Sequence, residues 1–193
     1  MTVLEKKFFP MTPSENAMNE TENLRDRILV TVHNQVGYAV VQGRGSFKVS
    51  ASVKNFGNTL LESGVNHLVL DLRDCVGMDS TFMGVLAGLC TRFHRETGGA
   101  VQVSHASEKI QRLMSTLGLD RLLDSVNAPL AAPPQGHGAG LTELNAAPQT
   151  PLATAETMLE AHENLLDVHE DNSQRFQDVL DYLREDIKRQ RHG

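Results

Sequence analysis

The chain has 193 residues, with 18 Lys and Arg against 24 Asp and Glu and a formal net charge of −6. This length suits one domain with extensions, and the negative charge argues against direct nucleic-acid binding, which requires clustered positive charge. No segment approaches the run of about 18 apolar residues needed to span a membrane, and the first residues lack the apolar stretch of a signal peptide. With only Cys75 and Cys90, the sequence predicts buried, reduced thiols in a cytoplasmic protein.

Composition divides the chain into four parts. Residues 1–23 lack hydrophobic periodicity and are expected to form a flexible tail. Residues 24–127 are expected to form the globular domain. Residues 128–152 are rich in Ala, Pro and Gly, so we expect a linker with no strand or long helix there. Residues 153–191 are expected to form a C-terminal helical extension.

Within the domain, strand and helix patterns alternate. The expected elements are strands over 28–32 and 38–41 joined by a hairpin turn at 34–37, a helix capped by Ser50 that ends at 63–64, a strand over 67–72, a helix from about residue 80 to Gly98, a strand over 100–104 and a helix capped by Ser107 that stops at Gly118. This order, with its short connections, predicts an α/β fold in which helices cover a mixed sheet.

The last part of the chain carries two amphipathic helical patterns. The apolar stripe of the first is formed by Met158, Leu159, His162, Leu165 and Leu166, and that of the second by Phe176, Val179, Leu180, Leu183 and Ile187. Candidate caps for the second helix lie at 171–173. Because neither helix can bury its stripe alone, each must dock on the domain, on the other helix or on a partner.

The segment 71–89, DLRDCVGMDSTFMGVLAGL, is the most informative. A buried strand is expected to end at Leu72, a loop to run to Asp79, and a helix to begin near Ser80 or Thr81. Two hydroxyl groups then lie beside the unpaired N–H groups and the positive dipole end of a helix. Asp79 or Ser80 could simply cap the helix. The other interpretation is a phosphorylation site, because a helix N-terminus tolerates an added phosphate.

The same segment resembles the signature of the STAS family, the domain of bacterial anti-sigma factor antagonists. In that family a buried strand leads through a loop to Met-Asp-Ser-Ser/Thr-Gly-Leu-Gly at the start of a helix, and this chain has Met-Asp-Ser-Thr at 78–81. The resemblance covers 25–124, including Gly-Arg-Gly at 43–45. Residues 107–123, SEKIQRLMSTLGLDRLL, are similar to the family's third helix and its ending. The resemblance implies a STAS-like fold and a role in bacterial signal transduction and transcription regulation.

For the mechanism, the resemblance implies partner switching. The unmodified protein would bind an anti-sigma factor that is also a serine/threonine kinase, and phosphorylation would release it; a phosphatase is a further candidate partner. Thr81 matches the phosphorylated residue, with Ser80 a less favoured acceptor. The implied partner-binding residues are Asp79, Ser80, Thr81, Phe82 and Met83. The protein would be the substrate of the kinase and not itself an enzyme.

Three features depart from the family pattern. Phe82 stands where the family usually has Gly, Thr81 replaces the commoner Ser, and the residues after 127 exceed a minimal single-domain antagonist. In addition, Met83 falls off the inward stripe of its helix. We therefore expect Met83 to be exposed beside Thr81, where a flexible apolar side chain suits a protein contact.

Two other functional hypotheses stay open. One is a constitutive STAS scaffold, a subunit of a stress-sensing assembly or of a lipid-transport ABC complex, in which Ser80 and Thr81 form a contact surface. The other, an enzyme or nucleotide-binding protein, lacks a motif: the glycines at 43–45 do not complete a dinucleotide loop, and the eight His show no metal-ligand spacing. We expect no catalytic residues, no metal, no cofactor and no membrane insertion.

Overall fold

The computed structural model describes residues 26–125, 140–144 and 149–192. The tail predicted over 1–23 lies outside the described residues, as does most of the linker predicted over 128–152. Within the described residues, the mixed sheet covered by helices confirms the predicted α/β fold class.

The sheet has the strand order β6-β5-β3-β2-β1-β7, with β4 also pairing with β2. Its strands are β1 Arg27–His33, β2 Val36–Gly45, β3 His67–Asp71, β4 Cys75–Met78, β5 Ala100–Ser104, β6 Asp124–Ser125 and β7 Thr142–Glu143. β1 pairs antiparallel with β2 and β7, and the other pairs are parallel. The predicted hairpin is confirmed: Asn34 and Gln35 both have positive φ, 49° and 63°, as tight two-residue hairpin turns require.

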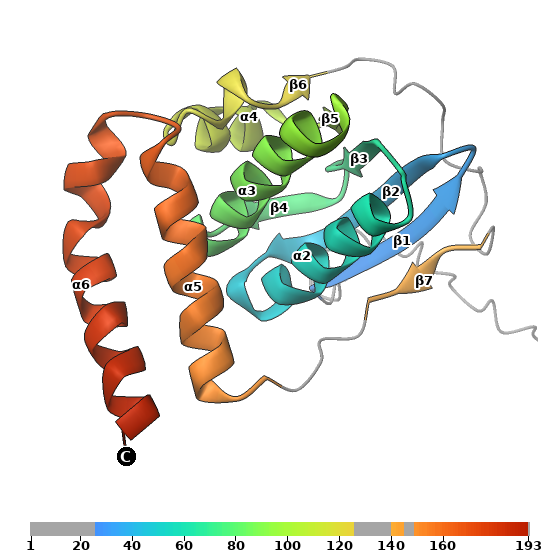
Figure 1. Ribbon diagram of the computed structural model, residues 1–193. Coiled ribbons are helices and arrows are strands. Elements are labelled where there is room, and N and C mark those ends of the chain that lie inside the picture. Colours follow the sequence, from blue (N-terminus) through green and yellow to red (C-terminus); the bar gives the residue numbers. More distant parts are fainter. Residues whose placement is uncertain (1–25, 126–139, 145–148, 193) are drawn as a thin grey trace, which may run out of the picture.

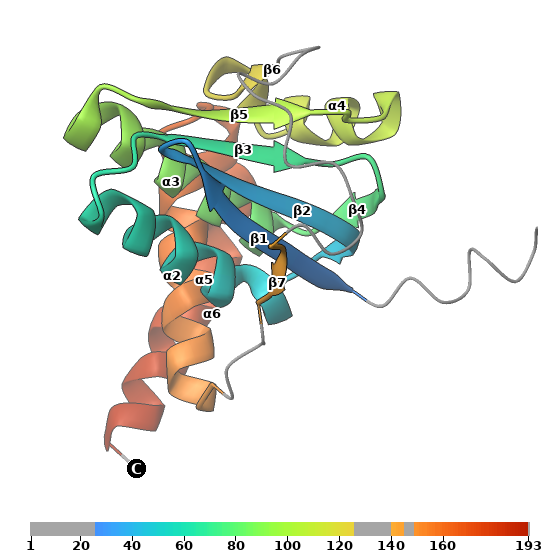
Figure 2. The ribbon, with the colours of Figure 1, turned by 90° about the vertical axis from the view of Figure 1, so that its right-hand side faces the viewer.

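The helices are α2 Phe47–Glu62, α3 Ser80–Thr97, α4 Glu108–Ser115, α5 Pro151–Leu166 and α6 Asp171–His192, with a short 3₁₀ helix over Leu119–Arg121. α2 and α3 lie side by side on one face of the sheet, as Figures 1 and 2 show. α5 packs along α3 on the side away from the sheet and also contacts α2, while α6 packs on α5. The C-terminal helices were expected to dock on the domain, on each other or on a partner. In the structure they dock on the domain and on each other.

The start of α2 differs from the one predicted. α2 begins at Phe47, three residues before the predicted cap, because Ser46 takes the N-cap position. Ser50 is buried inside the helix, where its hydroxyl donates to the Ser46 carbonyl at 2.9 Å. At its other end α2 stops at Ser63, as predicted.

Besides β6, which pairs with β5 at the edge of the sheet, two further short strands were not predicted. β4 lies where a loop was expected, because the long strand β2 extends beyond β3: β3 pairs with Val36–Val40, and β4 then pairs with Gly43–Gly45. The expectation that the linker contains no strand is wrong at β7, which adds to the free edge of β1. Both strands form because a neighbouring main chain offers unpaired hydrogen-bonding groups.

One continuous apolar core joins the sheet, its helices and part of the C-terminal pair. The inward stripe predicted for α3 is confirmed, since Phe82, Leu86 and Phe93 are fully buried. The same core takes in four side chains of α5 and α6, namely Ala161, Leu165, Phe176 and Leu180. Among the helices of the described residues, none combines the length and the apolar character needed to cross a bilayer.

Candidate partner-binding and phosphorylation site

The junction between β4 and α3 is organised by one carboxylate. Asp79 is the N-cap of α3, and its Oδ1 accepts a hydrogen bond from the Phe82 N–H at 2.9 Å. Its Oδ2 accepts a second bond, at 2.7 Å, from the N–H of Phe47 in the first turn of α2. The capping interpretation of Asp79 is therefore confirmed, and this residue ties together the N-termini of both helices on that face of the sheet.

Ser80 follows the cap and is half-buried. Its hydroxyl lies 3.0 Å from Nε2 of His162 in α5, while Nδ1 of the same ring lies 2.7 Å from the Met158 carbonyl. Because a carbonyl only accepts, the network assigns the proton to Nδ1, so that Nε2 accepts from Ser80. His162 is buried and packs edge-on against Phe176, with ring centroids 5.0 Å apart. It is thus a packed, hydrogen-bonded imidazole.

The next three residues are buried. Thr81 is 3 % exposed, Phe82 0 % and Met83 3 %. The ring of Phe82 lies against Gly45, where a Cβ atom would approach it to 2.6 Å, so the glycine makes room for this phenylalanine. The predicted exposure of Met83 is wrong. Met83 does lie off the sheet-facing stripe, but it is buried as part of the main apolar core, which also includes side chains of the C-terminal helices.

The contact between α3 and α5 depends on small residues. Gly84 faces the main chain of Ala161, and a methyl group at Gly84 would overlap the Ala161 carbonyl oxygen. Nδ2 of Asn164 donates to the Gly84 carbonyl at 3.3 Å. One turn later, Gly88 faces the side chain of Asn164. This contact was not predicted, although a line of small residues at 84, 87 and 88 is a usual sign of close helix packing.

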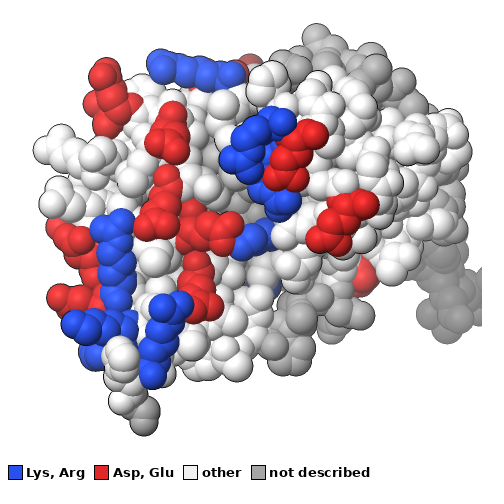
Figure 3. All heavy atoms as spheres, in the orientation of Figure 1, with Lys and Arg blue, Asp and Glu red and all other residues white. Residues whose placement is uncertain are grey.

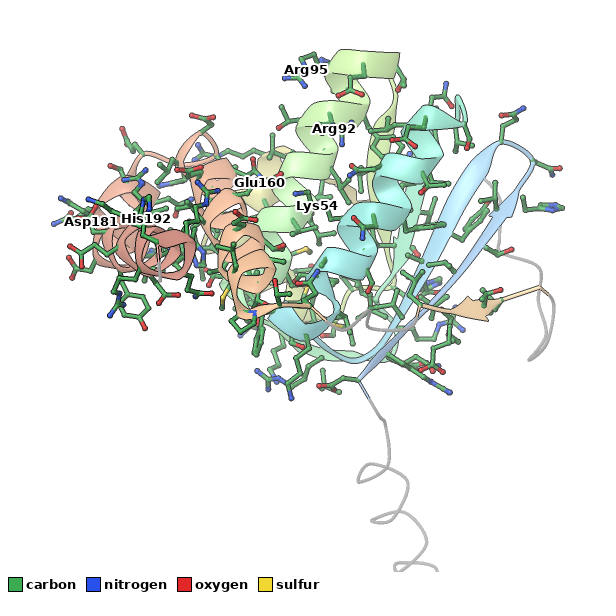
Figure 4. The ribbon with its side chains drawn as sticks, turned by 60° about the horizontal axis from the view of Figure 1, so that its bottom comes forward. Lys54, Arg92, Arg95, Glu160, Asp181 and His192 are labelled. Atoms are coloured by element: carbon green, nitrogen blue, oxygen red, sulfur yellow. The ribbon has the colours of Figure 1, made fainter. Side chains whose placement is uncertain are left out.

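A cavity of about 210 Å³ opens between α2, α3 and α5. Figure 4 shows four charged side chains around it, Lys54, Arg92, Arg95 and Glu160. Lys54 pairs with Glu160, and Arg92 pairs with Glu96 at 2.9 Å. The hydrogen bond with Glu96 raises the pKa of Arg92, and the same bond lowers the pKa of Glu96. The cations are thus matched by nearby carboxylates, an arrangement that stabilises helix packing.

The wider surface shows no accumulation of one charge on the face in view. Acidic and basic side chains are mixed over α5 and α6 (Figure 3). In the part of the chain that the structure describes, no three His, Cys, Asp or Glu side chains gather closely enough to hold a metal ion. The predicted burial of Cys75 and Cys90 is confirmed, with each 6 % exposed. Burial raises the pKa of the Cys75 thiol, whose Sγ–H donates to the Gly77 carbonyl.

The chain is similar to solved structures of anti-sigma factor antagonists. The chain resembles an anti-sigma factor antagonist from Mycobacterium paratuberculosis (20 % identity, TM-score 0.46, covering 53 % of this chain and 86 % of that one). It also resembles the anti-sigma factor antagonist SpoIIAA in its unphosphorylated form (14 %, 0.44, 53 % and 88 %) and SpoIIAA of Bacillus in its phosphorylated form (15 %, 0.43, 52 % and 91 %). No curated protein matches the sequence. The family model of the STAS domain matches residues 23–131, more than half of the chain. The chain therefore belongs to the STAS domain family.

Proposed function

We propose that this protein is an anti-sigma factor antagonist that regulates transcription by partner switching. In its unphosphorylated state it binds an anti-sigma factor with serine/threonine kinase activity. Phosphorylation at Thr81, with Ser80 as the less favoured acceptor, releases that partner, and a phosphatase restores binding. The chain is the substrate of this chemistry and contributes no catalytic group. We expect it to act in the bacterial cytoplasm.

The observation that carries this proposal is the placement of two hydroxyl groups at the start of α3. Ser80 and Thr81 are the first two residues of the helix, directly after the Asp79 cap, in a STAS domain. A phosphate there adds a charge of about −1.5 to −2 next to the positive end of the helix dipole, which lowers its cost to the free protein.

The same phosphate has a different effect in an interface. In a closely packed contact with a partner, a dianion loses its hydration and repels any carboxylate opposite it. The modified protein therefore loses its partner. Asp79 contributes to this surface mainly by holding α2 and α3 in register, because both of its carboxylate oxygens are engaged within the chain.

One observation favours the alternative of a constitutive scaffold. Thr81 is 3 % exposed, so a kinase has no access to its hydroxyl in the arrangement described. A STAS subunit held permanently in a stress-sensing or lipid-transport complex would need no such access. The two candidates differ in whether Thr81 is ever modified.

Quantitative phosphosite mass spectrometry on the protein purified from its native cells, with and without stress, decides between them. Phosphate on Thr81 whose stoichiometry changes with stress is the expected result. Ser107 is a matched control, because it is an exposed serine at the N-cap of α4 and should stay unmodified. A deep map in which Thr81 and Ser80 never carry phosphate would reject the switch and favour the scaffold.

A further inference from the structure

The hairpin formed by α5 and α6 has an apolar cluster of its own. Ala155 of α5 packs with Leu183 and Ile187 of α6, separately from the main core. Two ion pairs also join the helices, between Glu163 and Arg184 at 3.0 Å and between Glu156 and Arg191 at 2.6 Å. The two helices therefore have contacts that hold them together without the domain.

The contact of this hairpin with the domain combines apolar side chains, which join the main core, with a set of polar contacts. It includes the Ser80–His162 hydrogen bond, the bond from Asn164 to the Gly84 carbonyl, and the Lys54–Glu160 ion pair. Each of these groups can exchange its partner for water at modest cost when the surfaces separate. The polar part of the contact therefore opens at modest cost, and the buried apolar side chains of α5 and α6 add to that cost.

The surface under the hairpin includes the proposed acceptor. Ser80, Gly84 and Gly88 follow one another at intervals of four residues, so they lie on one side of α3, the side that faces α5. Thr81 lies one turn before Gly84 on the adjoining side. Met83 belongs to the main apolar core, which also includes Ala161, Leu165 and Phe176 of the hairpin.

We propose that the α5–α6 hairpin is an autoinhibitory cover, which must swing away from α3 before a kinase or an anti-sigma factor can reach Thr81. This inference rests on the proposed function, and it concerns how access to Thr81 is regulated. In the closed state, α5 occupies the face of α3 that the partner would use. In the open state, the hairpin is held together by its own cluster and ion pairs while the start of α3 becomes accessible.

A glycine substitution can act as a wedge in this contact. In Gly84→Ala, the added methyl group meets the rigid main chain of Ala161, so α5 must move. Alanine favours a helix more than glycine does, so α3 itself gains stability. Gly88→Ala is the matched control: its methyl group meets only the end of the Asn164 side chain, which can rotate away. A second wedge, Ala161→Leu, enlarges the hairpin side and leaves α3 unchanged.

The readout is the accessibility of position 81 in the full-length chain. Thr81→Cys introduces a thiol of similar size, and its alkylation by iodoacetamide is followed by peptide mass spectrometry. The buried Cys75 is the internal baseline, since its raised pKa keeps it largely in the unreactive thiol form. Labelling of a buried group follows the population of the open state.

We expect the two wedges to raise the labelling rate at position 81 by about tenfold or more, because overpacking a rigid contact weakens it strongly. Gly88→Ala should change it by less than about threefold, since its clash is relieved by one side-chain rotation. Hydrogen exchange should accelerate in α5, since a detached helix of this length is marginal in water, and should stay slow in β3 and β5. Equal labelling in all backgrounds, with β3 and β5 protected, would overturn the cover.

The result of the labelling experiment can be distinguished from the result of the phosphosite test of the proposed function. If the wedges expose position 81 but Thr81 never carries phosphate in cells, the cover exists and the phosphorylation switch is wrong. If Thr81 is phosphorylated in cells while both wedges leave labelling unchanged, the switch holds and the hairpin is not its gate. Acceleration of exchange in β3 and β5 together with α5 would show general unfolding and would also reject a hinged cover.

Discussion

The double cap at Asp79 makes the stability of the domain sensitive to a single carboxylate. Asp79→Ala removes the acceptor of the Phe82 N–H and that of the Phe47 N–H at once. Asp79→Asn is nearly isosteric and keeps one carbonyl oxygen, so it can preserve only one of the two bonds. The pair of variants therefore separates the loss of one helix cap from the loss of both.

The size of the effect follows from the number of bonds. An N-cap side chain contributes about 1 kcal/mol, so Asp79→Ala should lower the free energy of unfolding by about 2 kcal/mol and Asp79→Asn by about 1 kcal/mol. For a urea dependence of about 2 kcal/mol per M, the alanine variant shifts the unfolding midpoint by about 1 M. Because Asp79 is half-buried, water replaces part of each bond, and these values are near the lower end for charged acceptors.

Urea unfolding followed by circular dichroism measures these shifts. Ser107→Ala is the control, because Ser107 caps only α4, through a longer bond of 3.4 Å to the Ile110 N–H. Its cost should not exceed about 1 kcal/mol. An unfolding midpoint that Asp79→Ala moves no further than Ser107→Ala does would contradict the double cap. Equal stability of Asp79→Asn and Asp79→Ala would contradict it as well.

Substitutions at other buried or paired side chains of α2, α3, α5 and α6 should also change stability in a defined way. Asn172 is fully buried and donates to two main-chain carbonyls at 3.1 and 2.8 Å, so Asn172→Ala should cost about 3 kcal/mol in urea unfolding; a cost under about 1 kcal/mol would contradict this. Phe82→Ala leaves a cavity against the sheet and should cost about 3 to 5 kcal/mol in the same measurement; a near-neutral effect would mean that Phe82 is exposed in solution. A double-mutant cycle on Lys54 and Glu160 should give a coupling below about 1 kcal/mol, because the Glu160 side chain is 53 % exposed; a larger coupling would show that this pair, and not apolar packing, holds α5 in place.

Much of the fold could be predicted because its signals are local. Hydrophobic periodicity marks the sheet-facing stripe of α3, and its ends are set by the Asp79 cap and by Gly98, whose φ of 66° favours glycine. The cap of α4 at Ser107 is equally local, but α4 ends at Ser115, before the stop predicted at Gly118, whose φ is 79°. The motif at the start of α3 located the candidate site for the same reason.

What the sequence did not reveal depends on contacts between segments distant in the chain. β7 has two residues, too few for a pattern, and exists only because β1 offers a free edge. Periodicity shows that α5 is amphipathic, but it does not show which surface receives the apolar side. Only the tertiary structure places Ala161 against Gly84 and His162 against Ser80. Thr81 and Met83 are buried beside this contact. Burial is decided by whatever covers a helix face, and the helix that covers the Ser80 side of α3 lies some eighty residues further along the chain.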